Sequence, residues 1–294
     1  MTIDYISDTH IDFWCREVNG QSPKLQKQID QLFSYILPKE GDVLIIAGDL
    51  GHYYSQDITF LKRLKEYYKH IFLVPGNHDM YLLSNGSRKK YGLNSWSRVL
   101  EMKAFCRENE GFHYLDGNVV NINGINFGGA GMHWDGSFAK TLCSDMTDGE
   151  LLGHWENVMN DANLIYWEGK DHIKVPTAYG GSYSVPSFKP LDFFKSQKEK
   201  LDKIDAVDVM ITHYAPRIPD NMRQRYKEDL ASSFYYFDGS EYVERLKPKY
   251  WVYGHTHDRV DETENGCNFL CNPLGYPGEN TYNVIKRFEI KDVE

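Results

Sequence analysis

Short apolar segments without polar interruption alternate with amphipathic helical segments in the first third of this 294-residue chain. Strands are expected at residues 43–47 and 71–74, because a short continuous apolar run is typical of a strand buried on both faces. Residues 2–7 are interpreted as a further short strand, which ends at Ser7-Asp8. Helices are expected between them, at residues 23–40 and 55–69, where apolar side chains recur every three or four positions. This alternation predicts parallel β-strands joined by helical crossovers.

Local residues set the expected boundaries of the first helix. Ser22 is a suitable N-cap residue, and Pro23 suits the first helical position. Gly41 is expected to end the helix, because glycine readily adopts the left-handed conformation that closes a helix.

The rest of the chain contains a hairpin, an irregular segment and a return to the strand–helix pattern. Asn123-Gly124 predicts a tight turn between two strands. Residues 131–190 are rich in Gly, Trp, Tyr and Asp and only weakly periodic, so they are interpreted as an insertion resembling a cap, with one helix near 150–160. The further expected elements are strands at 119–122 and 125–129, a helix at 191–204, a strand at 207–211, a helix at 240–247, a strand at 250–253 and antiparallel strands within 259–290.

These elements predict one domain covering residues 1–294, with two packed β-sheets and helices outside them. The fold class is α/β, or α+β in some classifications. A chain of this size can bury about three quarters of its unfolded surface, so it needs no disulfide or structural metal to fold.

Composition and cysteine usage narrow the possible partners and location. The net charge of −9 disfavours nucleic acid held on a broad basic face. No apolar run approaches the ~18 residues of a membrane span, and the first residues lack the pattern of a signal peptide. Cys267 and Cys271 alone are close in sequence, which is weak evidence for zinc, so free thiols in a reducing cytoplasm are expected.

Polar clusters follow five of the expected strands, at the point where each strand ends. Because the carboxyl ends of strands gather at one edge of an α/β sheet, these clusters are expected to meet although they span 250 residues. Burying so many polar groups costs ~1–3 kcal/mol for each one left unpaired, and a bound cation would remove that cost. The clusters are Asp8-Thr9-His10, Gly48-Asp49, Gly76-Asn77-His78-Asp79, Thr212-His213 and Gly254-His255-Thr256-His257.

The candidate ligands in these clusters are too many for one ion. They offer oxygen and imidazole nitrogen but no thiolate, which suits Mn, Fe, Zn, Co or Ni, with manganese favoured. Two divalent ions ~3.5–4 Å apart would fit, and one carboxylate would have to bridge them. The seven candidates are Asp8, His10, Asp49, Asn77, His213, His255 and His257.

The ordered set D-x-H, G-D, G-N-H-D, T-H and G-H-T-H, spread over residues 8–257, resembles the calcineurin-like metallophosphoesterase superfamily. The resemblance implies a four-layer αββα sandwich, in which helices flank two mixed β-sheets. It also implies that a metal-bound hydroxide hydrolyses a phosphomonoester or phosphodiester. The implied ligand sets are Asp8, His10 and His257 for one ion, Asn77, His213 and His255 for the other, and Asp49 as the bridge.

Two histidines beyond the ligand set are candidates for catalysis. His78 follows a ligand directly and is expected to act as general acid or as a donor to a phosphoryl oxygen, with a purely supporting hydrogen bond as the alternative. Its neighbour Asp79 is expected to brace the loop. His52 stands where the exonuclease-like branch of the superfamily has a histidine, so it is expected to orient His78 or contact a phosphate; a surface role is the alternative.

Departures from the family pattern bear on the substrate. The run after Gly48-Asp49 lacks the second Asp and the Arg of the G-D-x-x-D-R-G motif of protein phosphatases, so a phosphoprotein substrate is doubtful. Segments 131–135, 159–161 and 271–276 resemble small bacterial and phage phosphoesterases, and the first two are interpreted as pocket wall or as scaffold. Two basic groups, Arg88-Lys89-Lys90 and Arg217, Arg223, Arg225 and Lys227, could hold a substrate phosphate, although solvated loops are favoured.

The sequence therefore predicts a dinuclear-metal phosphoesterase acting on a small phosphate ester. A DNA or RNA nuclease of the same superfamily is the alternative, which the acidic net charge disfavours. A non-catalytic scaffold of this fold is disfavoured because His10, His78 and the histidines of the last cluster are all present. The oligomeric state is left open.

Overall fold

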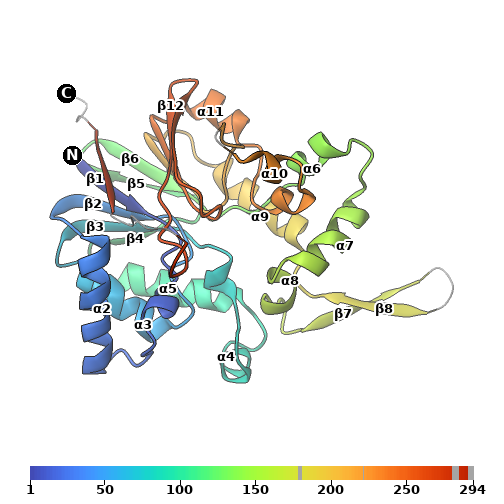
Figure 1. Cartoon of the computed structure of the whole chain (residues 1–294), viewed down its shortest axis with the longest axis horizontal. Coiled ribbons are helices and arrows are strands. Elements are labelled where there is room, and N and C mark those ends of the chain that lie inside the picture. Colours follow the sequence, from blue (N-terminus) through green and yellow to red (C-terminus); the bar gives the residue numbers. More distant parts are fainter. Residues whose placement is uncertain (178–180, 221, 280–284, 291–294) are drawn as a thin grey trace.

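Two large mixed β-sheets form the centre of the molecule (Figure 1). The computed structural model describes residues 1–177, 181–220, 222–279 and 285–290. One sheet has the strand order β13-β1-β2-β3-β4 and the other β11-β12-β10-β9-β6-β5. Their bounds are β1 (Thr2–Ile6), β2 (Gly41–Ile46), β3 (Tyr68–Leu73), β4 (Phe112–Tyr114), β5 (Asn118–Ile122), β6 (Ile125–Gly129), β9 (Val209–Ile211), β10 (Tyr250–Tyr253), β11 (Val260–Glu264), β12 (Cys267–Cys271) and β13 (Lys286–Glu289).

Each sheet has a parallel centre and antiparallel strands at its edges. In the first sheet β1 to β4 run parallel and β13 is antiparallel to β1. In the second, β6, β9, β10 and β12 run parallel, whereas β5 and β11 are antiparallel edge strands. Ile6 pairs with Ile46 and Ile46 with Leu73, so β1, β2 and β3 end level with one another. A parallel bridge between Ser7 and Pro273 joins the ends of the two sheets.

Helices cover the outer faces of both sheets. In Figure 1, α2, α3 and α5 lie on one side of the molecule, and α9 and α11 lie beside the six-stranded sheet. The helices are α1 (Ile11–Trp14), α2 (Pro23–Ile36), α3 (Tyr54–Leu64), α4 (Asn85–Lys90), α5 (Trp96–Glu108), α6 (Ser137–Leu142), α7 (Asp148–Val158), α8 (Asp161–Leu164), α9 (Pro190–Leu201), α10 (Gln224–Lys227) and α11 (Ser240–Leu246), with 3-10 turns η1 (His78–Met80) and η2 (Leu230–Phe234).

The strands bury side chains on both faces. Between the sheets, Val43 and Ile45 of β2 belong to the same buried cluster as Val209 of β9, and the rings of Phe72 and Phe127 stack across the interface with centroids 4.5 Å apart. The intervening residues of β2, such as Leu44, belong to the buried cluster that includes the apolar faces of α2 and α3. The predicted four-layer αββα sandwich with two mixed sheets is thereby confirmed.

Two helix ends differ from the sequence-based expectation. Ser22 caps α2 and Pro23 begins it, but the helix ends at Ile36 and Leu37 adopts φ 49°. Pro38 explains the early end, since the residue before a proline avoids the helical conformation. The prediction for Gly41 was therefore wrong, because Gly41 begins β2.

The second difference lies at the end of α3, which stops at Leu64 rather than continuing to residue 69. Tyr68 and His70 instead pair with Gly41 and Val43 in β3. Pairing with a neighbouring strand thus overrides the helical pattern of this segment.

The segment interpreted as an insertion contains α6, α7 and α8 and a hairpin of β7 (His172–Pro176) and β8 (Ser182–Pro186). α7 matches the helix expected near 150–160, whereas the hairpin was not foreseen. The hairpin projects from the body of the molecule (Figure 1). The organisation as one domain with an insertion stays a prediction. In the described parts of the chain, we find no helix with the length and apolar character needed to cross a membrane.

Candidate metal centre

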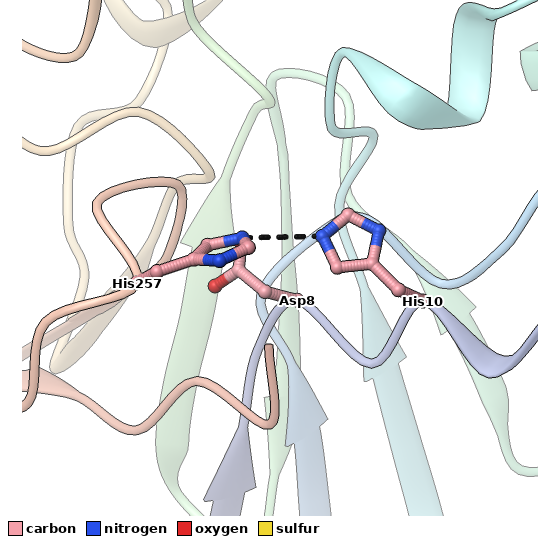
Figure 2. Close-up of side chains that lie close together, drawn as sticks. All are labelled: Asp8, His10 and His257. Atoms are coloured by element: carbon pink, nitrogen blue, oxygen red, sulfur yellow. Dashed lines mark hydrogen bonds and ion pairs between the residues drawn. The ribbon is translucent and has the colours of Figure 1, made fainter. Parts of the chain in front are cut away.

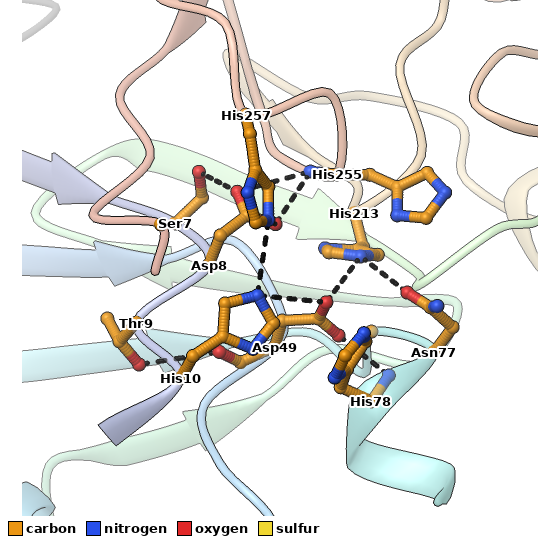
Figure 3. Close-up of polar contacts among 12 residues, drawn as sticks. Ser7, Asp8, Thr9, His10, Asp49, Asn77, His78, His213, His255 and His257 are labelled. Atoms are coloured by element: carbon orange, nitrogen blue, oxygen red, sulfur yellow. Dashed lines mark hydrogen bonds and ion pairs between the residues drawn. The ribbon is translucent and has the colours of Figure 1, made fainter. Parts of the chain in front are cut away.

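The carboxyl ends of five parallel strands place all seven candidate ligands in one polar cluster (Figure 3). β1, β2 and β3 lead to Asp8, Asp49 and Asn77, and β9 and β10 of the other sheet lead to His213 and His255. Every candidate is buried except His257, which is partly exposed. The predicted convergence of residues 8 to 257 is therefore present in the structure.

The first set of donors is Asp8, His10 and His257 (Figure 2). The Nε2 atoms of His10 and His257 face each other at 3.2 Å, and Nε2 of His257 lies 3.6 Å from Oδ1 of Asp8. The carboxylate of Asp8 also accepts hydrogen bonds from the Ser7 hydroxyl, at 2.5 Å, and from the backbone N–H of His255, at 2.9 Å. One ligand atom from each of the three residues can therefore reach a common point.

The second set is Asp49, His213 and His255, with Asn77 beside it. Oδ1 of Asn77 lies 3.1 Å from Nε2 of His213, on the side that faces Asp49 (Figure 3). Oδ2 of Asp49 is 3.4 Å from Nε2 of His213 and 3.7 Å from Nε2 of His10. Asp49 thus lies between His10 of the first set and His213 of the second, where a bridging carboxylate would have to be.

Three histidines are oriented by an acceptor behind them. Nδ1 of His213 donates to the carbonyl of Ala47 at 2.9 Å, and Nε2 of His255 donates to the carbonyl of Phe234 at 3.2 Å. Nδ1 of His257 donates to Glu279 at 2.7 Å. In each ring the other nitrogen is left to face the cluster, an arrangement that is usual for metal-binding histidines.

The backbone at most of the candidate ligands adopts the left-handed conformation, which residues other than glycine disfavour. φ is positive at five of the seven positions, a strain of ~1–3 kcal/mol for each such residue. Strain of this kind persists where a site requires it, and the loops after the strands turn sharply here to aim their side chains inward. The five residues are Asp8 (50°), His10 (39°), Asp49 (55°), His255 (69°) and His257 (53°).

Two motif glycines lie where no side chain fits. A Cβ atom added to Gly48, whose φ is 82°, would lie 2.4 Å from Nδ1 of His213. A Cβ added to Gly76 would lie 2.0 Å from Oδ1 of Asp49. The absence of a side chain at Gly48 thus permits the close approach of the His213 ring.

Burial dominates the electrostatics of the cluster. It lowers the pKa of His10 and His255 and raises that of Asp8. For His213 burial alone would also lower the pKa, but the Asp49 carboxylate outweighs it and raises the pKa to about 9. Burial opposes ionisation of Asp49 as well, yet His213 and its neighbours hold that pKa well below its usual range.

The donor set fits divalent ions. Two carboxylates, an amide oxygen and imidazole nitrogens are packed together out of water, and Nδ1 of His10 has no hydrogen-bond partner among the described residues. The facing nitrogens of His10 and His257 cannot both be satisfied by one another unless one carries a proton. A cation gives them a common partner.

His78 lies at the end of a hydrogen-bonded chain. Oδ2 of Asp12 accepts from Nδ1 of His52 at 2.7 Å, and Nε2 of His52 is 3.0 Å from Nδ1 of His78. Nε2 of His78 is 3.4 Å from the hydroxyl of Tyr276. Because a carboxylate only accepts, His52 carries its proton on Nδ1 and His78 donates from Nδ1. Burial lowers the pKa of His78 to about 4.

These hydrogen bonds bear on the roles considered for His52, which were to orient His78, to contact a phosphate or to lie at the surface. Its side chain is only 3 % exposed and contacts His78 directly. The surface role therefore does not hold, whereas orientation of His78 has a geometric basis.

Asp79 holds the loops after β2 and β3 together. Its carboxylate accepts hydrogen bonds from the backbone N–H groups of Gly76, Asp49 and Leu50 at 2.8, 3.0 and 3.0 Å. Burial raises the pKa of Asp79 to about 6, and the nearby Asp49 carboxylate adds to the shift. The expectation that Asp79 braces its loop agrees with these contacts.

A cleft of about 600 Å³ opens over the cluster. Asp49, Asn77 and His78 are part of its lining. Its outer walls come from the end of α7 and the turn before α8, from the region of α10 and η2, and from the segments after β10 and β12. These walls include Val158, Met159, Asn160, Met222, Arg223, Tyr226, Asp229, Tyr235, Asp258, Tyr276 and Glu279.

The segments singled out in the insertion have different positions. Met132, His133 and Trp134 are fully or almost fully buried, so this part is scaffold. Met159 and Asn160 line the cleft.

Of the two basic groups, Arg223 is found in the lining of the cleft. Arg217 pairs with Glu262 at 2.7 Å, and Lys90 pairs with Glu101 at 2.8 Å. The guanidinium of Arg88 lies over the ring of Tyr166. The side chain of Arg225 lies outside the described residues.

Sequence reasoning missed several residues that position the site. Asp12, Glu279 and Arg98 are distant in sequence from the partners that they contact. Asp12 lies two residues after the D-x-H motif, which was a weak signal. The other two residues follow no motif, and only the fold brings them to the site.

Comparisons with known proteins agree with this geometry. A sequence model of the calcineurin-like phosphoesterase family matches residues 1–259, so the chain belongs to that family. Members of the family act on phosphate esters. Uncharacterized protein L509 of Acanthamoeba polyphaga mimivirus is 25% identical over 297 residues, which cover 97% of this chain and 95% of that protein.

Solved structures support the fold. Phosphopantetheinyl hydrolase (PptH) from Mycobacterium tuberculosis superposes with a TM-score of 0.58 at 16% identity, covering 98% of this chain and 95% of that one. A putative 5'-nucleotidase from Staphylococcus aureus reaches a TM-score of 0.36 at 10% identity, covering 93% and 48% of the two chains, and is too distant to support an argument.

Proposed function

We propose that this protein is a dinuclear-metal phosphoesterase that hydrolyses a small phosphomonoester or phosphodiester. The observation that carries the proposal is a pair of neighbouring three-residue donor sets, of which Asp49, His255 and His257 line the cleft. Membership of the calcineurin-like phosphoesterase family supports the class of reaction.

The two sets of donors would each hold one divalent ion. Bound there, the ions would activate a water molecule as nucleophile and offset negative charge on the phosphoryl oxygens. Manganese is our first choice, with iron, zinc, cobalt and nickel as alternatives, because the donors are oxygen and imidazole nitrogen. The proposed ligands are Asp8, His10 and His257 for one ion, Asn77, His213 and His255 for the other, and Asp49 for both.

His78 would act on the leaving group. The hydrogen bonds from Asp12 through His52 make Nδ1 of His78 a donor. Nε2 of His78 is then left for the cleft, which His78 lines. In the protonated form Nε2 would give its proton to the departing oxygen, and in either form it would lie beside the phosphoryl group. Its backbone N–H donates to Oδ1 of Asp49 at 2.9 Å, which ties its position to the proposed bridging ligand.

The lining of the cleft favours a small substrate over nucleic acid. Apart from Asp49, the lining includes the carboxylates of Asp229, Asp258 and Glu279, and Arg223 is the one Arg or Lys among its described residues. A nucleic-acid backbone would meet more negative than positive charge at these walls. The tyrosine and methionine side chains instead offer apolar and aromatic surface for an organic leaving group. The nuclease alternative is therefore disfavoured by the cleft as well as by the net charge.

The test is a parallel assay of metal-free protein and protein reloaded with Mn²⁺. The substrates are p-nitrophenyl phosphate, bis-p-nitrophenyl phosphate, cyclic nucleotides and single-stranded DNA. We expect metal-dependent turnover of at least one small ester, loss of that turnover in Asp49→Asn, and no loss in Asp261→Asn on the exposed edge strand β11. Faster cleavage of DNA would favour the nuclease, and no turnover of any substrate would favour a non-catalytic scaffold. The cytoplasmic location stays a prediction.

A further inference from the structure

We propose that Asp161, the first residue of α8, is a positioning residue that fixes which end of the Asn77 amide faces the metal centre. The inference rests on the proposed function, because it takes Asn77 as a ligand. It gives the segment 131–190 a part in completing the centre, in addition to forming a wall of the cleft.

The contacts between Asp161 and Asn77 are direct and buried. Asp161 is 0 % exposed, and its Oδ1 accepts from Nδ2 of Asn77 at 2.8 Å and from the hydroxyl of Tyr81 at 2.5 Å. Nδ2 of Asn77 lies 3.2 Å from the same hydroxyl. The nitrogen end of the amide is thus occupied on the side away from the centre, and its oxygen lies 3.1 Å from Nε2 of His213.

The chemistry of an amide explains why such a partner is needed. The two ends of an asparagine side chain are similar in shape, but only the oxygen has a lone pair to give to a cation. With the amide reversed, Oδ1 of Asn77 would face the carboxylate of Asp161, and the NH2 group would point at the ion. A carboxylate that accepts two hydrogen bonds on one oxygen therefore selects the orientation that can bind metal.

Asp161 is itself held from behind by buried groups. Its Oδ2 is 3.5 Å from the hydroxyl of Tyr214 and 3.9 Å from Nε2 of His133. His133 is 0 % exposed, and neither of its ring nitrogens has a hydrogen-bond partner among the described residues. The surroundings of Oδ2 are therefore buried and polar, with the Tyr214 hydroxyl at hydrogen-bond distance.

Two substitutions of Asp161 separate orientation from charge. In Asp161→Asn the new side chain keeps an oxygen for Asn77, and its NH2 group can donate to Tyr214 and His133. In Asp161→Ala the acceptor is lost and the Asn77 amide is free to reverse. Loss of an outer hydrogen-bond partner typically weakens metal binding by ~10–100-fold.

The measurement is metal binding without substrate. Metal-free proteins are titrated with Mn²⁺ against a chromogenic chelator, and spin-coupled Mn²⁺ pairs are counted by electron paramagnetic resonance. We expect Asp161→Ala to lose ~10–100-fold in affinity for one of two ions, with fewer coupled pairs, and Asp161→Asn to stay close to wild type. Asp135→Ala is the matched control, because Asp135 lies in the same segment and, among the residues that the structure describes, bonds to the backbone N–H groups of Ser137 and Asp238.

The outcomes are distinct. If Asp161→Ala bound both ions with wild-type affinity, the proposal would be overturned. It would also be overturned if Asp161→Asn lost as much affinity as Asp161→Ala, because the effect would then be due to charge. Thermal unfolding of the metal-free variants separates lost affinity from lost stability, and Asp161→Asn remains informative if Asp161→Ala fails to fold. If the wild-type protein binds two ions but hydrolyses no ester, the proposed function fails and the positioning role of Asp161 is retained.

Discussion

Asp8, Asp49 and His257 each combine a side chain suited to a cation with a backbone conformation that favours glycine or asparagine. Their strain has to be offset by the rest of the fold, and their loops receive many hydrogen bonds for that purpose. The carboxylate of Asp79, for example, accepts from three backbone N–H groups. At the scale of single residues, the candidate centre is thus a locally unfavourable arrangement that the surrounding structure maintains.

His78 offers a test of chemistry at this scale. We expect His78→Ala to lower kcat by about 100-fold or more for an alkyl phosphate, whose leaving group needs a proton, and by less than about 10-fold for p-nitrophenyl phosphate. Steady-state kinetics with both esters measures the difference. The control is His172→Ala on the exposed hairpin strand β7. Equal losses with the two esters would mean that His78 only positions the substrate.

At the scale of elements, α5 connects the helical layer to the loops of the centre. Arg98 of this helix is buried, and its guanidinium donates to the carbonyls of His78, Tyr81 and Gly51 at 3.1, 3.0 and 3.0 Å. It also lies 3.9 Å from the buried carboxylate of Asp57. One side chain therefore joins the loops after β2 and β3.

Replacing this arginine should be costly. We expect Arg98→Met to lower the free energy of unfolding by ~3–5 kcal/mol, since it leaves a buried carboxylate without its cation and removes the guanidinium that donates to the carbonyls of Tyr81 and Gly51. Urea unfolding measures the change. Arg107→Met, on the exposed face of the same helix, is the control, with an expected change within ~0.5 kcal/mol. A similar small change for Arg98→Met would contradict a structural role for these contacts.

The pairing of β3 with β4 brings two histidines together. Nδ1 of His70 is 3.0 Å from Nε2 of His113, and the ring of His113 stacks on Phe72. Burial, with added repulsion from His70 and Lys65, lowers the pKa of His113 to about 4. The unfolded chain, with an ordinary histidine pKa near ~6.5, binds the proton first as the pH falls.

The free energy of unfolding should therefore decrease as the pH falls from about 6.5 to about 4. Below about pH 4, His113 should cause no further decrease. We expect His113→Gln, which keeps a polar contact but does not titrate, to make this decrease shallower. Urea unfolding in chelator at several pH values compares the two proteins. Parallel curves would contradict the assignment, because other histidines contribute equally to both.

The elements show where sequence patterns succeed and where they do not. β2, β9 and β10 follow from uninterrupted apolar residues, a pattern set by burial on both faces, whereas Asp4 interrupts the apolar residues of β1. α5 and β4 were not foreseen, because α5 buries Arg98 together with apolar residues and its periodicity is weak. The start of β3 was misassigned to a helix, since pairing with β2 decides its conformation.

At the scale of the whole molecule, the candidate centre joins the two sheets. Asp8, Asp49 and Asn77 follow strands of one sheet, and His213 and His255 follow strands of the other. Ions bound between them would act as a link that only the folded chain offers.

Metal should therefore stabilise the fold. At a free Mn²⁺ concentration 100 times Kd, binding adds about 2.7 kcal/mol, and we expect Tm to rise by about 5 °C or more over protein in chelator. Differential scanning calorimetry measures the shift. Asp49→Asn should lose most of it, and Ca²⁺ should give less than Mn²⁺ because imidazole donors suit it poorly. No shift in the wild-type protein would count against the centre.

The position of the candidate centre could be predicted from the sequence, whereas most of the residues that orient its ligands could not. All seven candidate ligands lie at strand ends, and that placement depends only on local apolar runs and on the topology of parallel sheets. The partners that orient them, such as Glu279 behind His257 and Asp161 behind Asn77, depend on how distant segments pack. Their placement needs the three-dimensional structure.

The order of the donors along the chain has a consequence for synthesis on the ribosome. The first set begins with Asp8 and is complete only with His257, and Tyr276, which lies beside His78, comes later still. β1 also acquires its edge partner β13 from residues 286–289. A nascent polypeptide thus carries its earliest carboxylates and imidazoles unmatched until His255 and His257 have been added, so neither set can close around an ion before those residues leave the ribosome.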